Sequence, residues 1–378
     1  MAGQVNGLHS AYEYCRSVFD MVSRVTRRSF LAGAGTATTV GLTGCTGLLG
    51  SGGGTLKILD FSYVYPDGIF DTIEEETGIT VELQSSDSSA RSLSLLRSGR
   101  SDHDIVALGN YAVSPAIEEG HIQPLTLEDL PGYDGVFDFV KKDYFSQDGQ
   151  VYAAPRSFGQ TPLAVNTDVV SPDEVTSLSV LFDQKYDGMV GHRDDARLQV
   201  LYERAANGKT PLNPTSADQV DFADTRDNLS RHVELSGSLW NTGGDSEQLL
   251  RSGQVAVEPV WNYLIHTMGQ DGFPIERIYP EEGTKAWFLQ FCVRDGAENV
   301  DAAHTFIQSW YGGVGYQSLV EPSHIAVPHE AIFEREGVDR AEYGLNEPGR
   351  FIYEEPKPQS LVEQYTETWN EAKQAAEG

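Results

Sequence analysis

The sequence predicts an α/β protein built on a parallel, doubly wound sheet, and two observations carry that prediction. The chain has 378 residues, of which 39% are hydrophobic and 10% aromatic, so it can form one large or two medium α/β domains. Short apolar runs also alternate with segments of helical periodicity through residues 56–120. This alternation is typical of sheets whose strands are joined by helices.

The first six expected elements follow one another closely. They are strands at 56–59, 79–83 and 105–108 and helices at 68–77, 88–98 and 113–119. Gly78, Gly99 and Gly120 end the three helices, since glycine takes up the left-handed backbone at a helix end without strain. Ligands of such sheets bind beyond the carboxyl ends of the strands, so we expect binding residues in segments 60–63 and 109–111.

The same reading extends to the C-terminus. It predicts strands at 162–165, 254–260 and 287–293, helices at 196–206, 216–233 and 300–311, and a C-terminal helix marked by Leu361, Tyr365 and Trp369. Trp261 and Tyr263 follow the strand 254–260, at a position suited to a ligand cleft. Cys292 lies in an apolar run and is expected to be a buried strand residue.

The charge of the chain is strongly negative. It contains 56 acidic and 27 basic residues, a formal net charge of −29, and the acids are scattered rather than grouped. We interpret this surface as an adaptation to very high salt, where long-range electrostatic steering is screened. No basic patch is evident, which argues against nucleic-acid binding.

The N-terminal segment has the features of an export signal and a lipid anchor. Arg27 and Arg28 precede a weakly apolar run at 31–42, and the run ends in Leu42-Thr43-Gly44-Cys45, a pattern typical of lipoproteins. We expect residues 1–45 to be a twin-arginine lipoprotein signal and Cys45 to carry lipid. Residues 46–55 are glycine-rich and are expected to be a flexible tether.

Two further expectations concern this region and the cysteines. Residues 1–20 fit no part of an export signal, so we expect translation to begin at Met21. The cysteines, Cys15, Cys45 and Cys292, are far apart and form no CxxC pair. We therefore expect no disulfide framework, no metal site and no cofactor.

Several segments, in order along the chain, resemble the spermidine/putrescine-binding proteins of ABC importers. They are 56–59, 76–81, 104–111, 155–159, 185–188, 194–197, 252–255, 280–283 and 302–307, within a region that spans 56–335. The resemblance implies a type II periplasmic-binding-protein fold, with two doubly wound α/β lobes, a ligand cleft between them and a hinge that the chain crosses twice. Lobe one would comprise 56–160 plus 262–320, and lobe two 161–261 plus 321–378.

The resemblance also implies an aromatic cage that holds an ammonium group beside a carboxylate, because ring faces attract cations. The candidate ligand-binding residues are Phe61, Ser62, Tyr63, Asn110, Tyr111, Phe158, Asp195, Trp240, Trp261, Tyr263 and Trp287. Simpler roles stay open at this point. Asp195 could be no more than the N-cap of the following helix, and the tryptophans could belong to the core.

Two positions depart from the family pattern and bear on the ligand. Leu198 and Tyr263 stand where further carboxylates are expected, so a long polyamine would lack partners for its charged ends. A solute with one cationic or polar head and a flat or apolar body fits better. Iron(III), through Tyr63, Tyr111 and Tyr263, and thiamine are the alternatives within this class.

A secreted enzyme on the same scaffold is a further alternative, although no GxSxG, HExxH or Walker motif occurs. We therefore expect a monomeric binding protein on the outer face of the cell membrane. It would deliver a small cationic, polyamine-like solute to the permease of an ABC importer.

Overall fold

The structure is a computed structural model, and it describes residues 54–315, 325–335 and 338–376. The expected signal, the expected lipidation site Cys45 and the expected tether through residue 53 lie outside the described residues. Thr55, the last residue of the expected tether, is the first residue of strand β1. Across the described part of the chain, no helix has the length and apolar character needed to cross a membrane.

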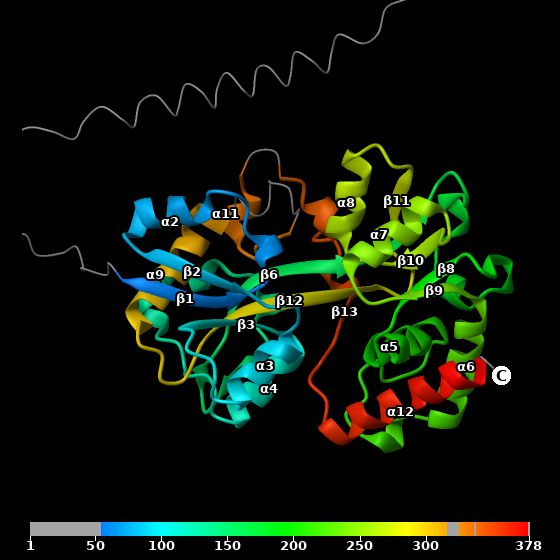
Figure 1. Cartoon of the computed structure of the whole chain (residues 1–378), viewed down its shortest axis with the longest axis horizontal. Helices are drawn as coiled ribbons and strands as arrows, with labels where there is room; N and C mark the ends of the chain where they lie inside the picture. Colours follow the sequence, from blue (N-terminus) through cyan, green and yellow to red (C-terminus); the bar gives the residue numbers. More distant parts are fainter. Residues whose placement is uncertain (1–53, 316–324, 336–337, 377–378) are drawn as a thin grey trace, which may run out of the picture. The chain divides into compact units, whose positions relative to one another are not determined.

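The first lobe is a mixed sheet with helices on both faces (Figure 1). Its strands are β1 (Thr55–Asp60), β2 (Thr80–Ser85), β3 (Ile105–Gly109), β6 (Ala154–Thr161), β12 (Thr284–Val293) and β13 (Phe351–Tyr353), in the order β13-β12-β3-β1-β2 with β6 paired to β12. Its helices are α2 (Ile69–Thr77), α3 (Ser89–Arg97), α4 (Asn110–Glu118), α9 (Val300–Ser309) and α11 (Glu330–Phe333), with a π-helical turn at Trp310–Val314. A small hairpin, β4 (Ser146–Gln147) and β5 (Gln150–Val151), lies before β6.

Alternation along each strand divides the first lobe into two cores. Leu56 and Ile58 of β1 pack with α2 and α9 on one face, whereas Leu59 packs with α3 and α4 on the other. Cys292 on β12 is fully buried on that second face, which confirms its expected position. The pairs β1–β2 and β1–β3 are parallel, as the alternating pattern predicted, but β12 runs antiparallel to β3 and β6.

The second lobe has its own mixed sheet, also covered on both faces (Figure 1). Its strands are β7 (Leu163–Asn166), β8 (Val190–Arg193), β9 (Ser236–Trp240), β10 (Val257–Pro259) and β11 (Ile275–Ile278), in the order β11-β7-β10-β8-β9. Its helices are α5 (Ala196–Ala206), α6 (Phe222–Leu235), α7 (Gly243–Ser252), α8 (Asn262–Gln270) and the C-terminal α12 (Gln359–Ala376). Helices α5, α6 and α12 pack together, and α7 packs against α8.

The expected two-lobe α/β architecture is confirmed, but the expected lobe boundaries are wrong in two places. Strand β11 pairs with β7, so residues 262–278 belong to the second lobe and not to the first. Strand β13 pairs with β12, which places 351–353 in the first lobe. Among the described residues the chain therefore passes between the sheets after Thr161, after Ile278 and after Tyr353.

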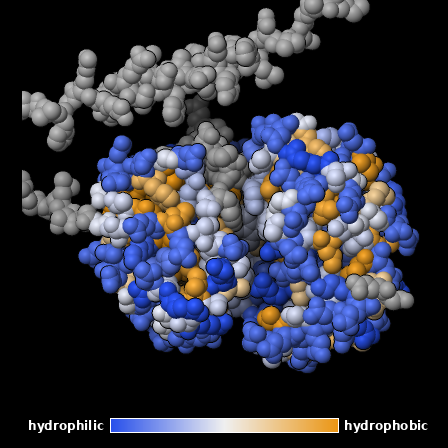
Figure 2. Space-filling view, in the orientation of Figure 1, coloured by the Kyte–Doolittle hydropathy of each residue, from blue (hydrophilic) through white to orange (hydrophobic). Residues whose placement is uncertain are grey.

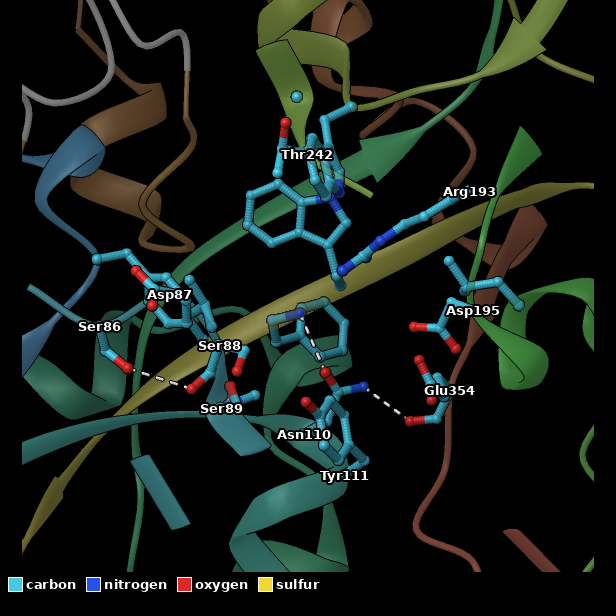
Figure 3. A pocket seen from close by; sticks show the side chains of 18 of the residues that line it. Ser86, Asp87, Ser88, Ser89, Asn110, Tyr111, Arg193, Asp195, Thr242 and Glu354 are labelled. Atoms are coloured by element: carbon cyan, nitrogen blue, oxygen red, sulfur yellow. Dashed lines mark hydrogen bonds between the residues drawn. The ribbon is translucent and has the colours of Figure 1, made fainter. Parts of the chain in front are cut away.

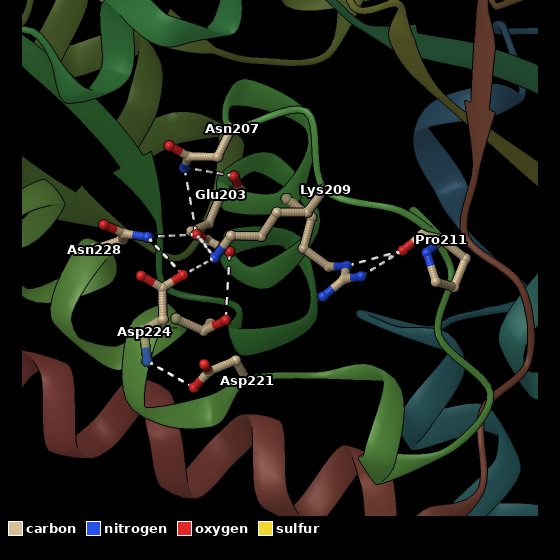
Figure 4. A network of polar contacts seen from close by, with 9 residues as sticks. Glu203, Asn207, Lys209, Pro211, Asp221, Asp224 and Asn228 are labelled. Carbon is tan, nitrogen blue, oxygen red and sulfur yellow. Dashed lines mark hydrogen bonds and ion pairs between the residues drawn. The ribbon is translucent and has the colours of Figure 1, made fainter.

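A buried polar network holds α5 in place at its C-terminal end (Figure 4). Glu203 is fully buried on α5 and pairs with Lys209, and its Oε1 accepts from Asn228 Nδ2 on α6 at 2.8 Å. Arg204 donates from Nε and Nη2 to the carbonyl of Pro211 at 2.9 and 2.7 Å. These contacts tie α5 to α6 and to the following loop, and so set the direction of the N-terminus of α5.

Candidate functional site

A cavity of about 440 Å³ is lined by residues of both lobes. Its volume lies in the usual range for small-molecule sites. Figure 2 shows a largely hydrophilic face that is hollowed between the two lobes. The lining residues are Phe61, Ser62, Ser85–Ser89, Gly109–Tyr111, Arg193, Asp195, Arg197, Leu198, Asn241–Gly243, Trp261, Tyr263, Lys285, Trp287–Leu289 and Glu354.

The lining follows from where the elements begin and end. Strands β1, β2 and β8 end at this cavity, and helices α3, α4, α5, α7 and α8 begin there. The unpaired N–H groups at a helix N-terminus carry a partial positive charge. Their convergence makes the cavity a favourable place for electronegative ligand atoms.

Eight of the eleven sequence-predicted residues line the cavity. They are Phe61, Ser62, Asn110, Tyr111, Asp195, Trp261, Tyr263 and Trp287. The side chain of Tyr63 lies outside what the structure describes. The remaining two, Phe158 and Trp240, are not among the lining residues, and both belong to buried cores.

The prediction for Phe158 and Trp240 is therefore corrected, and alternation along the strands explains it. Phe158 lies on the core side of β6 and meets Phe139 edge-on, with ring centroids 5.6 Å apart. The next residue, Gly159, faces Trp287. If position 159 had a Cβ, the Trp287 ring would lie only 2.1 Å from it, so the ring packs directly on the glycine backbone. Trp240 ends β9 beneath the cavity wall, where its ring meets that of Trp261 edge-on at 5.5 Å.

The aromatic residues of the cavity are already in contact with arginines. The guanidinium of Arg197 lies 4.0 Å from the ring centroid of Tyr111, and that of Arg193 lies 5.1 Å from the ring of Trp261. Tyr263 stacks on Trp261 at 5.9 Å. A ligand cation would therefore share these rings with the protein's own cations.

Asp195 has both of the roles considered for it. It is the N-cap of α5, accepting from the backbone N–H of Arg197 at 3.1 Å, and it also lines the cavity. Burial by itself would raise the pKa of its carboxyl, but Arg197, Arg193 and Lys285 together bring the pKa below the ordinary value. The side chain is therefore a carboxylate at neutral pH.

Ion pairs link this carboxylate to the first lobe. Arg197 lies 3.5 Å from Asp195 and 3.4 Å from Glu354, and Lys285 lies 3.5 Å from the other oxygen of Glu354. Glu354 follows β13, and Lys285 is on β12. Two acids and two bases thus form one network across the junction of the lobes, in which each carboxylate has a basic partner.

Asn110 is a positioning residue in the floor of the cavity (Figure 3). Its amide Nδ2 donates to the carbonyl of Glu354 at 2.9 Å, and its Oδ1 accepts from the backbone N–H of Phe288 at 3.2 Å. The start of α4, strand β12 and the segment after β13 are thereby held together.

Several lining residues were missed by the sequence reading. Ser85 ends strand β2 and 86–89 follow it, so the strand-end rule that selected Phe61 would have found them. Arg193 ends β8 and directly precedes the Asp194–Arg197 segment. Lys285 and Glu354 carry no local signal, because distant pairing of β12 with β13 brings them together.

No grouping of three or more His, Cys, Asp or Glu side chains suited to a metal ion occurs among the described residues. Tyr111 lies under Arg197, and Tyr263 stacks on Trp261.

Comparison with known proteins matches residues 68–328 to the bacterial extracellular solute-binding proteins. Spermidine/putrescine-binding periplasmic protein 1 of Haemophilus influenzae is 26% identical over 288 residues, covering 73% of this chain and 78% of the relative. The spermidine/putrescine-binding periplasmic protein of Escherichia coli is 24% identical over 250 residues, covering 66% of this chain and 70% of the relative.

Solved structures share the fold. The spermidine/putrescine ABC transporter substrate-binding protein of Streptococcus pneumoniae superposes with a TM-score of 0.75 at 17% identity, covering 85% of this chain and 99% of the other. The Tp0655 lipoprotein of Treponema pallidum superposes with a TM-score of 0.73 at 18% identity. The match covers 84% of this chain and 99% of that protein. The resemblance stated from the sequence is confirmed, and these relatives are binding proteins rather than enzymes. The chain belongs to the family of bacterial extracellular solute-binding proteins.

Proposed function

We propose that this protein captures a small organic solute that carries an amino group and delivers it to an ABC importer. A lipid on Cys45 would hold it at the outer face of the cell membrane, after export by the twin-arginine route. The observation that supports the proposal is the cavity itself, with aromatic rings and carboxylates supplied by both lobes. The names of the two curated relatives, which bind spermidine and putrescine, favour an amine as the ligand.

The charges of the cavity favour a short solute over a long polyamine. Asp195 and Glu354 already have Arg197 and Lys285 as partners, so they cannot neutralise several ammonium groups without displacing those bases. Leaving a desolvated ammonium without a carboxylate is costly. A solute with one ammonium group therefore fits better than spermidine.

A ligand panel tests this function. Putrescine, spermidine, thiamine and ferric citrate would each be titrated against the exported domain in molar salt, with thermal unfolding and calorimetry as readouts. A ligand at 100 times its Kd adds about 2.7 kcal/mol to the free energy of unfolding. We expect an amine to raise the unfolding midpoint, whereas a response to ferric iron alone would contradict the proposal.

Trp261→Ala should weaken binding of whichever amine the panel identifies by about 1–3 kcal/mol, because a large ring of the cavity wall is lost. Trp261→Phe keeps an aromatic face and should retain most of the affinity. Calorimetric titration of both variants gives the comparison. Equal affinities for wild type and Trp261→Ala would place the ligand elsewhere.

Cys45→Ala should move the protein from the membrane fraction to the medium, because the residue that would carry the lipid is gone. The matched control is Cys292→Ala, which removes the buried thiol on β12 and should leave the protein in the membrane fraction. Cell fractionation followed by immunoblotting measures both. Retention of Cys45→Ala in the membrane would refute the anchor.

A further inference from the structure

Arg193 supplies a cationic group to the cavity that the family resemblance did not imply. It is the last residue of β8 and is half-buried. In Figure 3 its side chain extends from the second lobe toward the middle of the lining residues. Arg193 therefore contributes a positively charged guanidinium to the lining of the cavity.

Among the described residues, the guanidinium of Arg193 has no carboxylate within ion-pair distance and no hydrogen-bond acceptor. The guanidinium lies over the ring of Trp261, and its charge acts on the Asp195 carboxylate from beyond ion-pair distance. The other described arginines that are buried or half-buried each donate to an oxygen of the protein. They are Arg156, Arg197, Arg204, Arg226, Arg277, Arg294 and Arg340.

This lack of a partner stands out in so acidic a chain. With 56 acidic and 27 basic residues, carboxylates are in excess over possible cationic partners. A half-buried guanidinium offers five N–H donors, and among the described residues no oxygen accepts from those of Arg193. These donors are therefore available to acceptor atoms of a ligand.

The surroundings of Arg193 suit an anionic group. The ring of Trp261, over which Arg193 lies, also packs against the start of α7, where a Cβ on Gly243 would lie 3.2 Å from the ring. Helix α7 spans Gly243–Ser252, and its N-cap Thr242 lines the cavity. A planar guanidinium provides paired N–H donors for a carboxylate, and the start of α7 lines the same cavity.

The opposite wall carries a charge of the opposite sign. Asp87 lines the cavity in the segment between β2 and α3 and forms no ion pair with the described residues. Figure 3 places Asp87 on the first-lobe side, across the cavity from Arg193. Arg197, Lys285, Asp195 and Glu354 form ion pairs with one another. The other charged residues of the lining are Arg193, on the second lobe, and Asp87, on the first.

We propose that the solute is a zwitterion whose carboxylate is bound by Arg193, while its ammonium group lies toward Asp87. This inference rests on the proposed function and narrows its ligand from amines in general to amino acids with separated charges. Such a ligand would bridge the two lobes through both of its ends, which a diamine could not do beside an arginine.

The test compares two solutes that differ at one end only. Putrescine and δ-aminovalerate both have an ammonium group followed by four methylene groups, and they end in a second ammonium and a carboxylate, respectively. Calorimetry in molar salt would measure both against wild type, Arg193→Gln and the control Arg231→Gln. Arg231 is exposed on α6 and does not line the cavity.

Wild type should bind δ-aminovalerate at least about tenfold more tightly than putrescine, as expected for one hydrogen-bonded charge pair. Arg193→Gln should remove that preference by weakening δ-aminovalerate alone, and Arg231→Gln should preserve it. Unchanged thermal unfolding of the free Arg193→Gln variant would exclude misfolding as the cause. Asp87→Asn should weaken both solutes, since both present an ammonium group.

The possible failures are distinguishable. Binding of putrescine without δ-aminovalerate would overturn the zwitterion inference and leave the solute-binding function standing. Equal weakening of both solutes by Arg193→Gln would also overturn it, because Arg193 would then serve only the shape of the cavity. If no solute of this pair or of the larger panel bound, the inference and the proposed function would both fall.

Discussion

Asp60→Asn should lower the free energy of unfolding by about 3–5 kcal/mol, the cost of leaving a buried charge without its partner. Asp60 ends β1 and is fully buried, and its Oδ1 lies 2.5 Å from Nη2 of the equally buried Arg156. It also accepts from Tyr65 Oη and from the backbone N–H of Phe61, both at 2.6 Å. Asparagine keeps the size but leaves the Arg156 guanidinium unpaired.

Urea denaturation at constant molar salt measures the effect. The exposed pair of Lys57 and Asp102 is the matched control, since its atoms are also 2.6 Å apart but both side chains are in water. Asp102→Asn should change the midpoint only slightly. The double variant Asp60→Leu/Arg156→Met should be more stable than Asp60→Asn. If Asp60→Asn were as stable as wild type, the pair of Asp60 and Arg156 would contribute nothing to the free energy of unfolding.

Glu258→Gln should make the protein more stable than wild type at alkaline pH but not at acidic pH. Glu258 is fully buried on β10, and burial raises the pKa of its carboxyl to about 8, although Ser246 and Trp240 act in the opposite direction. Between its unfolded pKa, near 4.5, and the native value, the native state holds a proton that the unfolded state has lost. Stability therefore falls as pH rises through this window.

The wild type loses about 1.4 kcal/mol of its free energy of unfolding for each unit by which the native pKa of Glu258 exceeds the unfolded one. The total loss is therefore a few kcal/mol. Glutamine cannot ionise, so the variant does not lose this stability. The difference in free energy of unfolding between variant and wild type should therefore grow from pH 5 to pH 8. The buried His192 and His232 have lowered pKa values, which make stability rise with pH up to about 6.5 in both proteins.

Urea titrations at a series of pH values test this, and Glu75→Gln, exposed on α2, is the control. A constant difference between Glu258→Gln and wild type across the range would contradict a protonated native Glu258. The carboxyl lies in the second-lobe sheet, where a Cβ on Gly191 would come within 2.3 Å of its Oε2.

The elements of the first lobe could be predicted because their signals are local. Helix α2 shows the point: Ile69 and Ile73 share one buried face, and Gly78 ends the helix in the left-handed region at φ 73°. Helix α4 begins three residues before its expected start, at Asn110, because the Asn110 side chain is held by β12 and by the segment after β13. That contact is tertiary and leaves no local pattern.

The division into lobes could not be read in full, for a related reason. Strand β13 has only Phe351–Tyr353, and its place is decided by pairing with β12, which lies far away in the sequence. Strand β11 likewise depends on its antiparallel partner β7. Short strands carry too little periodicity to reveal which sheet they join.

The sequence by itself determined the kind of protein and the aromatic part of its cavity. Phe61, Tyr111 and Trp261 follow strands or begin helices, and a strand end is a local property that a sequence displays. Apart from Asp195, the charged groups of the cavity were decided by the tertiary structure. Arg193 and Glu354 come from segments far apart in the chain, and only folding brings their charges together. Electrostatic interaction depends on distance in space, which a linear pattern of residues does not contain.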